Sequence, residues 1–500
     1  MNAKPQFRTS TLVAKPHSKS SVLNRFEPSY CRLDMRPSEP GVLEQLFSQM
    51  SQLPKSIFLD SSINTKSAAG DSLGRYSFLA AEPVHWYESQ ADCPQPFDLL
   101  RQQFSHFEST HLPELPPFQG GLAGLFSYDL NRSLETLDPP QDDAFKIPLL
   151  AFGVYDVVIG IDHVEDTIHV VSQGLPERAI KQRERKAKQR LDYFLNWLTT
   201  SKDDNTPPAN QPTQSPPGPK LAFPIEGSNG LFSNFTKASY LKAAQKCIDY
   251  IYEGDVFQVN LAQQLMCRAT RSSADLYRRM RTANPAPFSA FMDLGPAQII
   301  SASPERFLKV HDRVVETRPI KGTRPRTRHP EVDITVGQQL TKSEKDRAEN
   351  IMIVDLMRND LARVCHPDSV DVTQCCELES YQSVLHLVSA VNGTLKEEFD
   401  LFDLLTASFP GGSITGAPKI RAMQIIQELE PTARGAYCGS LGYIGMNGDM
   451  DLNILIRTIT ARDGWWQIPV GGGIVSQSNP EDEYRETWTK AEGMLKAIGL

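Results

Sequence analysis

Four charged side chains in this 500-residue chain have the types and spacing of a metal site. Glu483, Glu486 and Lys490 are three and four residues apart, so on a helix they share one face. That pattern alone is also typical of an exposed salt-bridge ladder. Glu349 favours the metal site, because it shares a helical stripe with apolar Ile353 and a core-facing carboxylate needs a partner.

A magnesium ion would satisfy these acids. Mg²⁺ prefers oxygen sites with few carboxylates, which leave positions for water and an anionic substrate. We therefore predict Glu349 and Glu486 as its ligands. Arg457 interrupts the apolar run Ile454 to Ile459, which predicts a buried strand. A buried guanidinium there would bind a carboxylate through two hydrogen bonds.

Two glycine-rich segments invite comparison with phosphate-binding loops. Gly411 to Ala417 begins with P-loop spacing, but Ala417 stands where the phosphate-binding lysine must be. Gly471 to Gly473 lies at a predicted strand end and lacks the G-x-G-x-x-G order. Neither segment predicts a nucleotide site, although both can present backbone N–H groups to a carboxylate. His386, in an apolar run, fits a core histidine as well as a catalytic one.

The composition excludes several other classes of function. At 40% hydrophobic residues the chain can bury a large core, and its net charge of -8 with mixed signs provides no basic face for nucleic acid. No apolar run reaches the roughly 20 residues that cross a bilayer. Eight cysteines without C-x-x-C spacing predict reduced thiols in the cytoplasm.

The chain divides at a proline-rich stretch. Residues 201–222 contain six prolines and predict a linker between an N-terminal region, 27–200, and a catalytic region, 223–500. Residues 1–26 are basic and serine-rich, which predicts a flexible segment and leaves an organellar targeting peptide open.

Helices and strands are predicted in mixed order, which favours an α+β fold over a doubly wound parallel sheet. Helical patterns cover 176–198, 235–253, 343–364 and the residues around Glu483. Strand patterns cover 256–265, 299–303, 307–310, 314–317, 454–461 and 465–470.

Five short sequence motifs indicate a family resemblance. They are Ser303-Pro304-Glu305-Arg306-Phe307, Pro319-Ile320-Lys321-Gly322-Thr323, Asp346 to Asn350, Ile353 to Asp360 and Gly411 to Lys419. Together, over roughly residues 230 to 500, the chain resembles the chorismate-utilising enzymes. The resemblance implies a large fold of two stacked antiparallel sheets flanked by helices, to which the N-terminal part contributes.

The resemblance also implies roles for individual residues. It makes Glu349 and Glu486 ligands of Mg²⁺, with Glu483 assisting through water. The residues that it places around chorismate are Arg457, Tyr443, Gly471, Gly472 and Gly473 at the side-chain carboxylate, and Gly322, Thr323 and Lys490 near the ring.

Three side chains bear on the reaction. Glu305 resembles the general acid that protonates the departing C4 hydroxyl. Gln258 stands where water-adding members carry a lysine, so attack by water is disfavoured. Lys321 matches the members that aminate C4 for p-aminobenzoate and folate synthesis, and there it would attack C2 before ammonia attacks C4. The alternative for Lys321 is an ion pair with an acid or with the substrate.

Ammonia implies a partner. No cysteine of this chain lies in a Gly-x-Cys-x-Gly elbow, so a separate glutamine amidotransferase subunit should supply it. A possible tryptophan pocket lies near the N-terminus, where the family resemblance covers Ser61, Arg75, Tyr76 and Ser77. Asp60 departs from the sequence motif of the family members that tryptophan inhibits. Two alternatives remain: an anthranilate-forming enzyme of tryptophan synthesis, and a non-catalytic regulatory subunit.

Overall fold

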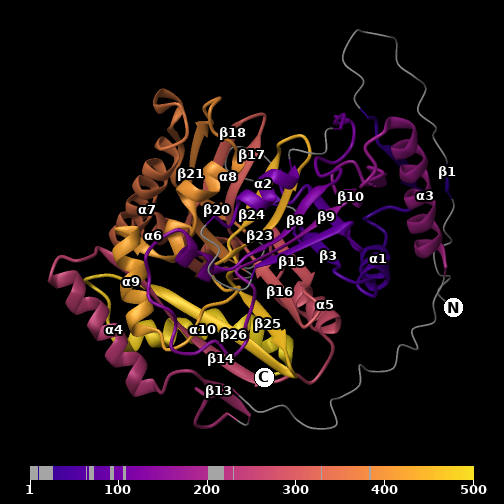
Figure 1. Ribbon diagram of the computed structural model, residues 1–500. Coiled ribbons are helices and arrows are strands. Elements are labelled where there is room, and N and C mark those ends of the chain that lie inside the picture. Colours follow the sequence, from indigo (N-terminus) through magenta and orange to yellow (C-terminus); the bar gives the residue numbers. More distant parts are fainter. Residues whose placement is uncertain are drawn as a thin grey trace.

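The computed structural model describes residues 9–10, 26–63, 65–66, 72–89, 95–104, 109–200, 219–228, 230–327, 329–381 and 384–500. Two large antiparallel sheets form its centre and helices flank them (Figure 1). This arrangement confirms the predicted α+β fold. Most of the predicted N-terminal segment, 1–26, and of the linker, 201–222, lies outside the described residues.

The larger sheet has 14 strands among the described residues. Its strands follow the spatial order β1 (Thr9–Ser10), β2 (Ser29–Leu33), β11 (Thr167–Ser172), β10 (Val157–Asp162), β6 (Tyr76–Ala80), β3 (Ile57–Asp60), β15 (Phe288–Asp293), β16 (Ala297–Ser303), β25 (Thr458–Arg462), β26 (Trp465–Ile474), β14 (Gln258–Arg268), β13 (Leu231–Ser233) and β12 (Phe223–Pro224), with β22 (Gly416–Ala417) beside β14.

The smaller sheet has 10 strands in the same described part. They follow the order β19 (Ile320–Pro325), β21 (Val384–Thr394), β18 (Val314–Arg318), β17 (Arg306–His311), β24 (Met450–Asn453), β23 (Ser440–Gly445), β8 (Gly121–Phe126), β9 (Leu150–Tyr155) and β7 (His85–Ser89), with β20 (Asp371–Ser380) beside β21.

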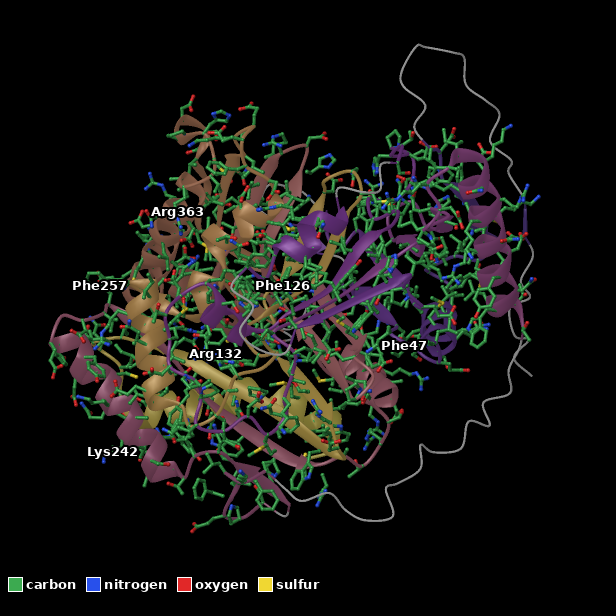
Figure 2. All side chains as sticks on the ribbon, viewed as in Figure 1. Phe47, Phe126, Arg132, Lys242, Phe257 and Arg363 are labelled. Carbon is green, nitrogen blue, oxygen red and sulfur yellow. The ribbon has the colours of Figure 1, made fainter. Side chains whose placement is uncertain are left out.

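Both sheets join strands from the two sides of residues 201–222. In the larger sheet β3 pairs with β15, and in the smaller sheet β8 pairs with β23. Every residue of β8 is buried, which is expected of a strand covered on both faces. Phe126, from β8, lies near the centre of the molecule, whereas Phe47, in helix α1 (Val42–Met50), belongs to a second core cluster (Figure 2).

Three predicted helices occur with caps that explain their starts. Helix α4 (Lys237–Tyr252) begins after Thr236, helix α7 (Glu344–Ala362) after Ser343 and helix α10 (Pro480–Ile498) after Asn479. Each capping side chain accepts hydrogen bonds from backbone N–H groups of the first turn. The other helices are α1 (Val42–Met50), α2 (Asp98–Phe104), α3 (Ile180–Thr199), α5 (Ser273–Ala283), α6 (Pro330–Lys342), α8 (Leu401–Ser408) and α9 (Lys419–Leu429).

The strand predicted over 454–461 is wrong in its first half. Strand β24 ends at Asn453 in the smaller sheet, and β25 begins at Thr458 in the larger sheet. Residues 454–457 therefore carry the chain from one sheet to the other outside either ladder. Ile454 and Leu455 are buried there, and Ile456 and Arg457 are partly buried. Conversely, β26 continues to Ile474, so Gly471 to Gly473 lie inside a strand and not beyond its end.

Candidate active site

Glu483 and Glu486 lie against a glycine of the larger sheet. Helix α10 packs on β26, and a Cβ atom at Gly472 would lie 3.3 Å from Glu483 Oε2 and 3.4 Å from Glu486 Oε1. Lys490 lies on the same helix face, with Nζ 2.7 Å from Glu486 Oε1 and 2.9 Å from the carbonyl oxygen of Gly471. The missing side chain at Gly472 thus leaves room for two carboxylates.

Glu349 reaches the same place from helix α7. The ammonium of Lys345 lies 3.9 Å from Glu349 Oε1 and 3.9 Å from Glu483 Oε1, so one cation lies between acids of two helices. Burial raises the pKa of both carboxyls, whereas the charge of Lys490 lowers the pKa of Glu486. The sequence prediction did not include Lys345.

The donor chemistry of these three carboxylates suits a magnesium ion, and their role as its ligands stays a prediction. Their donor atoms are all oxygen, which is the ligand type that Mg²⁺ prefers. Glu349 and Glu483 are raised in pKa by burial, and a divalent cation would favour their charged forms. Glu483 also accepts a hydrogen bond from Ser478 Oγ at 2.6 Å, which orients it.

Lys321 and Glu305 are joined through Ser413. Lys321 Nζ donates to the carbonyl oxygen of Ser413 at 3.2 Å, and Ser413 Oγ donates to Glu305 Oε1 at 2.6 Å. Burial raises the pKa of Glu305 to about 7 and lowers the pKa of Lys321. A carboxyl that holds a proton near neutrality therefore lies close to an amine that loses its proton more easily than usual. Sequence reasoning missed Ser413, although it lies in the Gly411 to Lys419 motif.

A bulge in β19 positions the neighbouring residues. Gly322 is the extra residue: Lys321 pairs with Leu387 and Thr323 with His386. Its φ is 64°, and a Cβ atom there would lie 2.9 Å from Leu340 Cδ1, so a larger residue would be strained and crowded.

His386 is a neutral histidine in the interior. Its Nδ1 is 2.9 Å from Thr323 Oγ1, and its Nε2 has no hydrogen-bond partner among the described residues. Burial, together with the charge of Arg457, lowers the pKa of His386 to about 3. The imidazole therefore cannot act as a cationic acid near pH 7, although Nε2 remains able to form a hydrogen bond.

Arg457 lies where the chain crosses between the sheets. Its backbone has a φ of 51°, and its Nη1 reaches Asn284 Oδ1 at 3.5 Å. It forms no ion pair with any carboxylate in the described part of the chain, and burial lowers its pKa. A guanidinium withdrawn from water without an acid partner is suited to a substrate carboxylate.

The other glycines of β26 face Gln258 and a free strand edge. A Cβ atom at Gly473 would lie 3.0 Å from the amide of Gln258. Both amide atoms of Gln258 are buried without a partner among the described residues. In that same part of the chain β25 pairs with β26 only as far as Gln467, so Gly471 to Gly473 have a strand partner on one side, β14.

The structure does not bring Tyr443 to this group. Its ring stacks on Phe118 with centroids 4.6 Å apart and meets Phe78 at 5.3 Å. It is part of a core cluster that includes residues of the N-terminal half. The predicted contact of Tyr443 with substrate stays a prediction.

The predicted tryptophan-pocket residues lie together, close to the start of β6. Arg75 pairs with Asp162 at 2.8 Å and lies over the ring of Tyr76. Ser61 Oγ donates to the carbonyl oxygen of Tyr76 at 2.8 Å, and the backbone N–H of Ser61 donates to Ser77 Oγ at 2.9 Å. The structure thus explains how these side chains are held, while tryptophan binding stays a prediction.

Asp60 has its own set of partners. It accepts hydrogen bonds from Tyr277 Oη at 2.8 Å and from Arg281 Nε at 2.7 Å, and its side chain is fully buried. The charge of Asp60 is therefore balanced by Arg281, a side chain of the protein itself.

Comparisons with known proteins agree with this geometry. Residues 59–496 match the family described as chorismate binding enzyme. Aminodeoxychorismate synthase component 1 of Salmonella typhimurium is 37% identical over 480 residues, which cover 92% of this chain and 97% of that protein. The chain therefore belongs to the chorismate binding enzyme family.

Relatives with another name are similar to the chain as well. Anthranilate synthase component 1 of Thermus thermophilus is 39% identical over 391 residues, covering 78% of this chain and 79% of that protein. The crystal structure of anthranilate synthase component I from Streptococcus pneumoniae superposes with a TM-score of 0.70 at 32% identity, covering 84% of this chain and 92% of that one. No helix in the described residues is both long and apolar enough to span a bilayer.

Proposed function

We propose that this chain aminates chorismate at C4 to give 4-amino-4-deoxychorismate, the reaction named by its relatives in Salmonella typhimurium and Escherichia coli. The observation that carries the proposal is the connection of Lys321 to Glu305 through Ser413. It supplies an amine nucleophile and a carboxylic acid in one buried group.

In the first step the Nζ of Lys321 forms a bond to C2 of chorismate. The ring double bonds shift and the C4–O bond breaks. Glu305 donates its proton, so the oxygen leaves as water, and the resulting carboxylate takes back the proton that the new C2 ammonium sheds. The pKa of Glu305, about 7, suits a group that both gives and receives a proton.

In the second step ammonia attacks C4 and the C2–N bond to Lys321 breaks. The departing amine takes the excess proton from the new C4 ammonium. The sum is chorismate plus ammonia giving 4-amino-4-deoxychorismate plus water, and Lys321 is regenerated. Gln258 supports ammonia over water as the nucleophile, because an amide cannot act as a general base.

The remaining residues would hold the substrate. Arg457 and the free backbone edge at Gly471 to Gly473 would bind a carboxylate of chorismate, and Thr323 and Lys490 would lie near its ring. Mg²⁺ held by Glu349 and Glu486, with Glu483 assisting, would neutralise negative charge on the bound anion.

Ammonia would come from a partner. The relatives are named component 1, which fits a second component, and we propose a glutamine amidotransferase subunit for it. The product would feed p-aminobenzoate and folate synthesis in the cytoplasm.

The main alternative is amination at C2 with release of pyruvate, as in anthranilate synthesis, and the similarity to the Thermus thermophilus protein supports it. The test is to incubate the full chain with chorismate, Mg²⁺ and an ammonium salt and to identify the product by chromatography and mass. We expect 4-amino-4-deoxychorismate and retained pyruvate. Fluorescent anthranilate would establish the alternative, and no turnover of folded protein would favour a regulatory subunit.

A further inference from the structure

The segment that contains Ser413 lies against strand β14. It forms the short 3-10 helix η3 (Gly412–Ile414) and then β22, whose two residues pair with Val259 and Gln258 of β14. The fit is close, because a Cβ atom at Gly416 would overlap the carbonyl oxygen of Gln258. A strand of two residues forms few hydrogen bonds of its own, so the position of Ser413 depends on contacts with other side chains.

Arg434 provides such contacts from the interior of the protein. The side chain is 2% exposed; its Nη1 donates to the carbonyl oxygen of Ile414 at 3.1 Å and its Nη2 to the carbonyl oxygen of Asn260 at 2.7 Å. Ile414 directly follows Ser413, and Asn260 belongs to β14. One guanidinium therefore joins the Ser413 segment to its neighbouring strand.

Glu430 fixes the direction of this guanidinium. Its Oε2 accepts from Arg434 Nε at 2.9 Å and its Oε1 from Arg434 Nη2 at 2.6 Å, which is the two-bond pairing typical of arginine with a carboxylate. Glu430 Oε1 also accepts from the backbone N–H of Ala262 at 2.8 Å, so the acid is attached to β14 as well. A lysine in place of the arginine could not reproduce this arrangement, because its ammonium is a point charge without a planar fork.

The position of Ser413 affects two groups at once. Lys321 Nζ donates to the carbonyl oxygen of Ser413 at 3.2 Å, and Ser413 Oγ donates to Glu305 Oε1 at 2.6 Å. The carbonyl group that Arg434 binds belongs to the next residue of the chain, so a displacement of this segment would lengthen both contacts. A displacement of about 1 Å is enough to lower the rate of a catalysed reaction up to about 10²-fold.

We propose that Arg434 is a positioning residue for the amination. By fixing Ile414 against β14, it keeps Ser413 in contact with the amine of Lys321 and the carboxyl of Glu305. Arg434 acts through Ser413 and takes no part in proton transfer, since a guanidinium stays protonated. The inference rests on the proposed function, in which that amine is the nucleophile and that carboxyl is the acid.

The pH dependence of the rate reports on this contact. The titratable groups that act on Glu305 from neighbouring elements include Lys321 on β19, Lys490 on α10 and Cys438. Arg434→Lys retains the positive charge, so the charges around Glu305 are kept while the planar fork is lost. When the Ser413 hydroxyl no longer donates to the carboxylate, the pKa of Glu305 rises and the protonated acid persists to higher pH.

The test measures kcat and KM for chorismate against pH in the full chain and in Arg434→Lys, with Mg²⁺ and an ammonium salt. We expect the alkaline decline of the variant to move to higher pH, as for Ser413→Ala, by up to about 1–2 pH units. Its kcat should fall about 10–100-fold, while KM should change less than about twofold because the guanidinium does not bind substrate. In the Ser413→Ala background, Arg434→Lys should move the decline no further, since the contact that it would break is already absent.

A second variant covers the case in which Arg434→Lys does not fold, since breaking one side of a buried ion pair is costly. Arg434→Met combined with Glu430→Gln removes both charges, and replacement of a whole buried pair is often neutral for stability. The glutamine oxygen can still accept from the N–H of Ala262, so the contacts that are lost are those with Ile414 and Asn260. This paired variant should show the same shift of the alkaline decline.

Arg190→Lys is the matched control, because Arg190 of α3 pairs with the buried Asp156 at 3.1 Å. It should be less stable in urea and keep the parental pH dependence. A folded Arg434→Lys or paired variant with the parental pH dependence overturns the proposal, and so does a further shift in the Ser413→Ala background. Loss of folding in both variants assigns Arg434 to the stability of the fold and overturns the proposal as well. Anthranilate as the product of the parent protein overturns the proposed function instead, and product analysis of the unaltered chain detects it independently of the variants.

Discussion

Ser413 donates its hydroxyl hydrogen bond to Glu305 at 2.6 Å, while its backbone carbonyl accepts one from Lys321. One residue therefore touches both the acid and the nucleophile of the proposed reaction. Since Ser413 stabilises the carboxylate form of Glu305, it opposes the effect of burial on that pKa.

Loss of the lysine amine should remove C4 amination. We expect Lys321→Ala to lower the rate with ammonium by at least about 10²-fold, because the covalent step needs a nucleophile. Lys321→Arg should not restore it, since a guanidinium stays protonated. Product formation is measured by chromatography, and wild-type C4 amination in Lys321→Ala would refute the covalent step.

The rate should fall as pH rises through about 7. Glu305 must carry a proton when the C4 oxygen leaves, and burial raises its pKa to about 7, so the active form is present below that pH and lost above it. Glu305→Gln should lower kcat by about 10²–10⁴-fold and abolish this alkaline decline. If the variant keeps the same decline, another group is the acid.

Ser413→Ala should move the alkaline decline to higher pH. Removing a donor to the carboxylate favours the protonated acid, so the pKa of Glu305 rises further. Hydrogen bonds to charged groups contribute about 1.5–3 kcal/mol, which corresponds to about 1–2 pH units. Ser408→Ala, a buried serine at the end of α8, serves as the control and should leave the pH profile unchanged.

Magnesium activation should depend on the acids of both helices. Glu486→Gln and Glu349→Gln each remove a charged oxygen ligand and should raise the Mg²⁺ concentration for half-maximal rate by about tenfold or more. Glu492→Gln, an exposed acid on the same helix as Glu486, is the matched control. The measurement is a titration of activity with Mg²⁺ after the protein has been treated with a chelator. If the Glu486→Gln, Glu349→Gln and Glu492→Gln variants all need the same Mg²⁺ concentration, the metal binds elsewhere.

Asp60→Ala should destabilise the fold by about 2–3 kcal/mol. Among the described residues, the change leaves Arg281 with Glu44 as its one acidic partner, at 3.5 Å, and removes the acceptor of Tyr277. The expected loss is smaller than the roughly 3–5 kcal/mol for breaking a fully buried ion pair, because Arg281 is 23% exposed and water screens its charge. Urea unfolding measures the difference, and Glu44→Ala, which removes an exposed partner of Arg281, should cost less than about 1 kcal/mol.

The sequence predicted the features that depend on residues close together in the chain. Helices α4, α7 and α10 were predicted from local patterns, and the structure adds the caps, such as Ser343 and Asn479, that explain where they begin. The face shared by Glu483, Glu486 and Lys490 is likewise a matter of helical spacing. Their meeting with Glu349 was predicted from the need of a core-facing carboxylate for a partner and from the ligand preference of Mg²⁺, and the family resemblance implied the same ligands.

Other features depend on contacts between distant segments. The apolar run at Ile454 to Ile456 has the composition of a strand, but the chain changes sheets there. The role of Ser413 comes from its meeting with Glu305, 108 residues away in the chain. Tyr443 is a further example, since no local pattern in the sequence indicates that its ring stacks on Phe118.

The interleaving of the two halves in both sheets has a consequence for synthesis on the ribosome. When the N-terminal half emerges, β3 and β8 lack their later partners, β15 and β23, and expose unpaired edges. Those edges stay open until the segments that pair with them have been translated, which makes the nascent chain prone to aggregation. Cells that make this protein therefore need chaperone protection over most of the reading frame, and splitting the gene near residue 210 should yield two insoluble fragments.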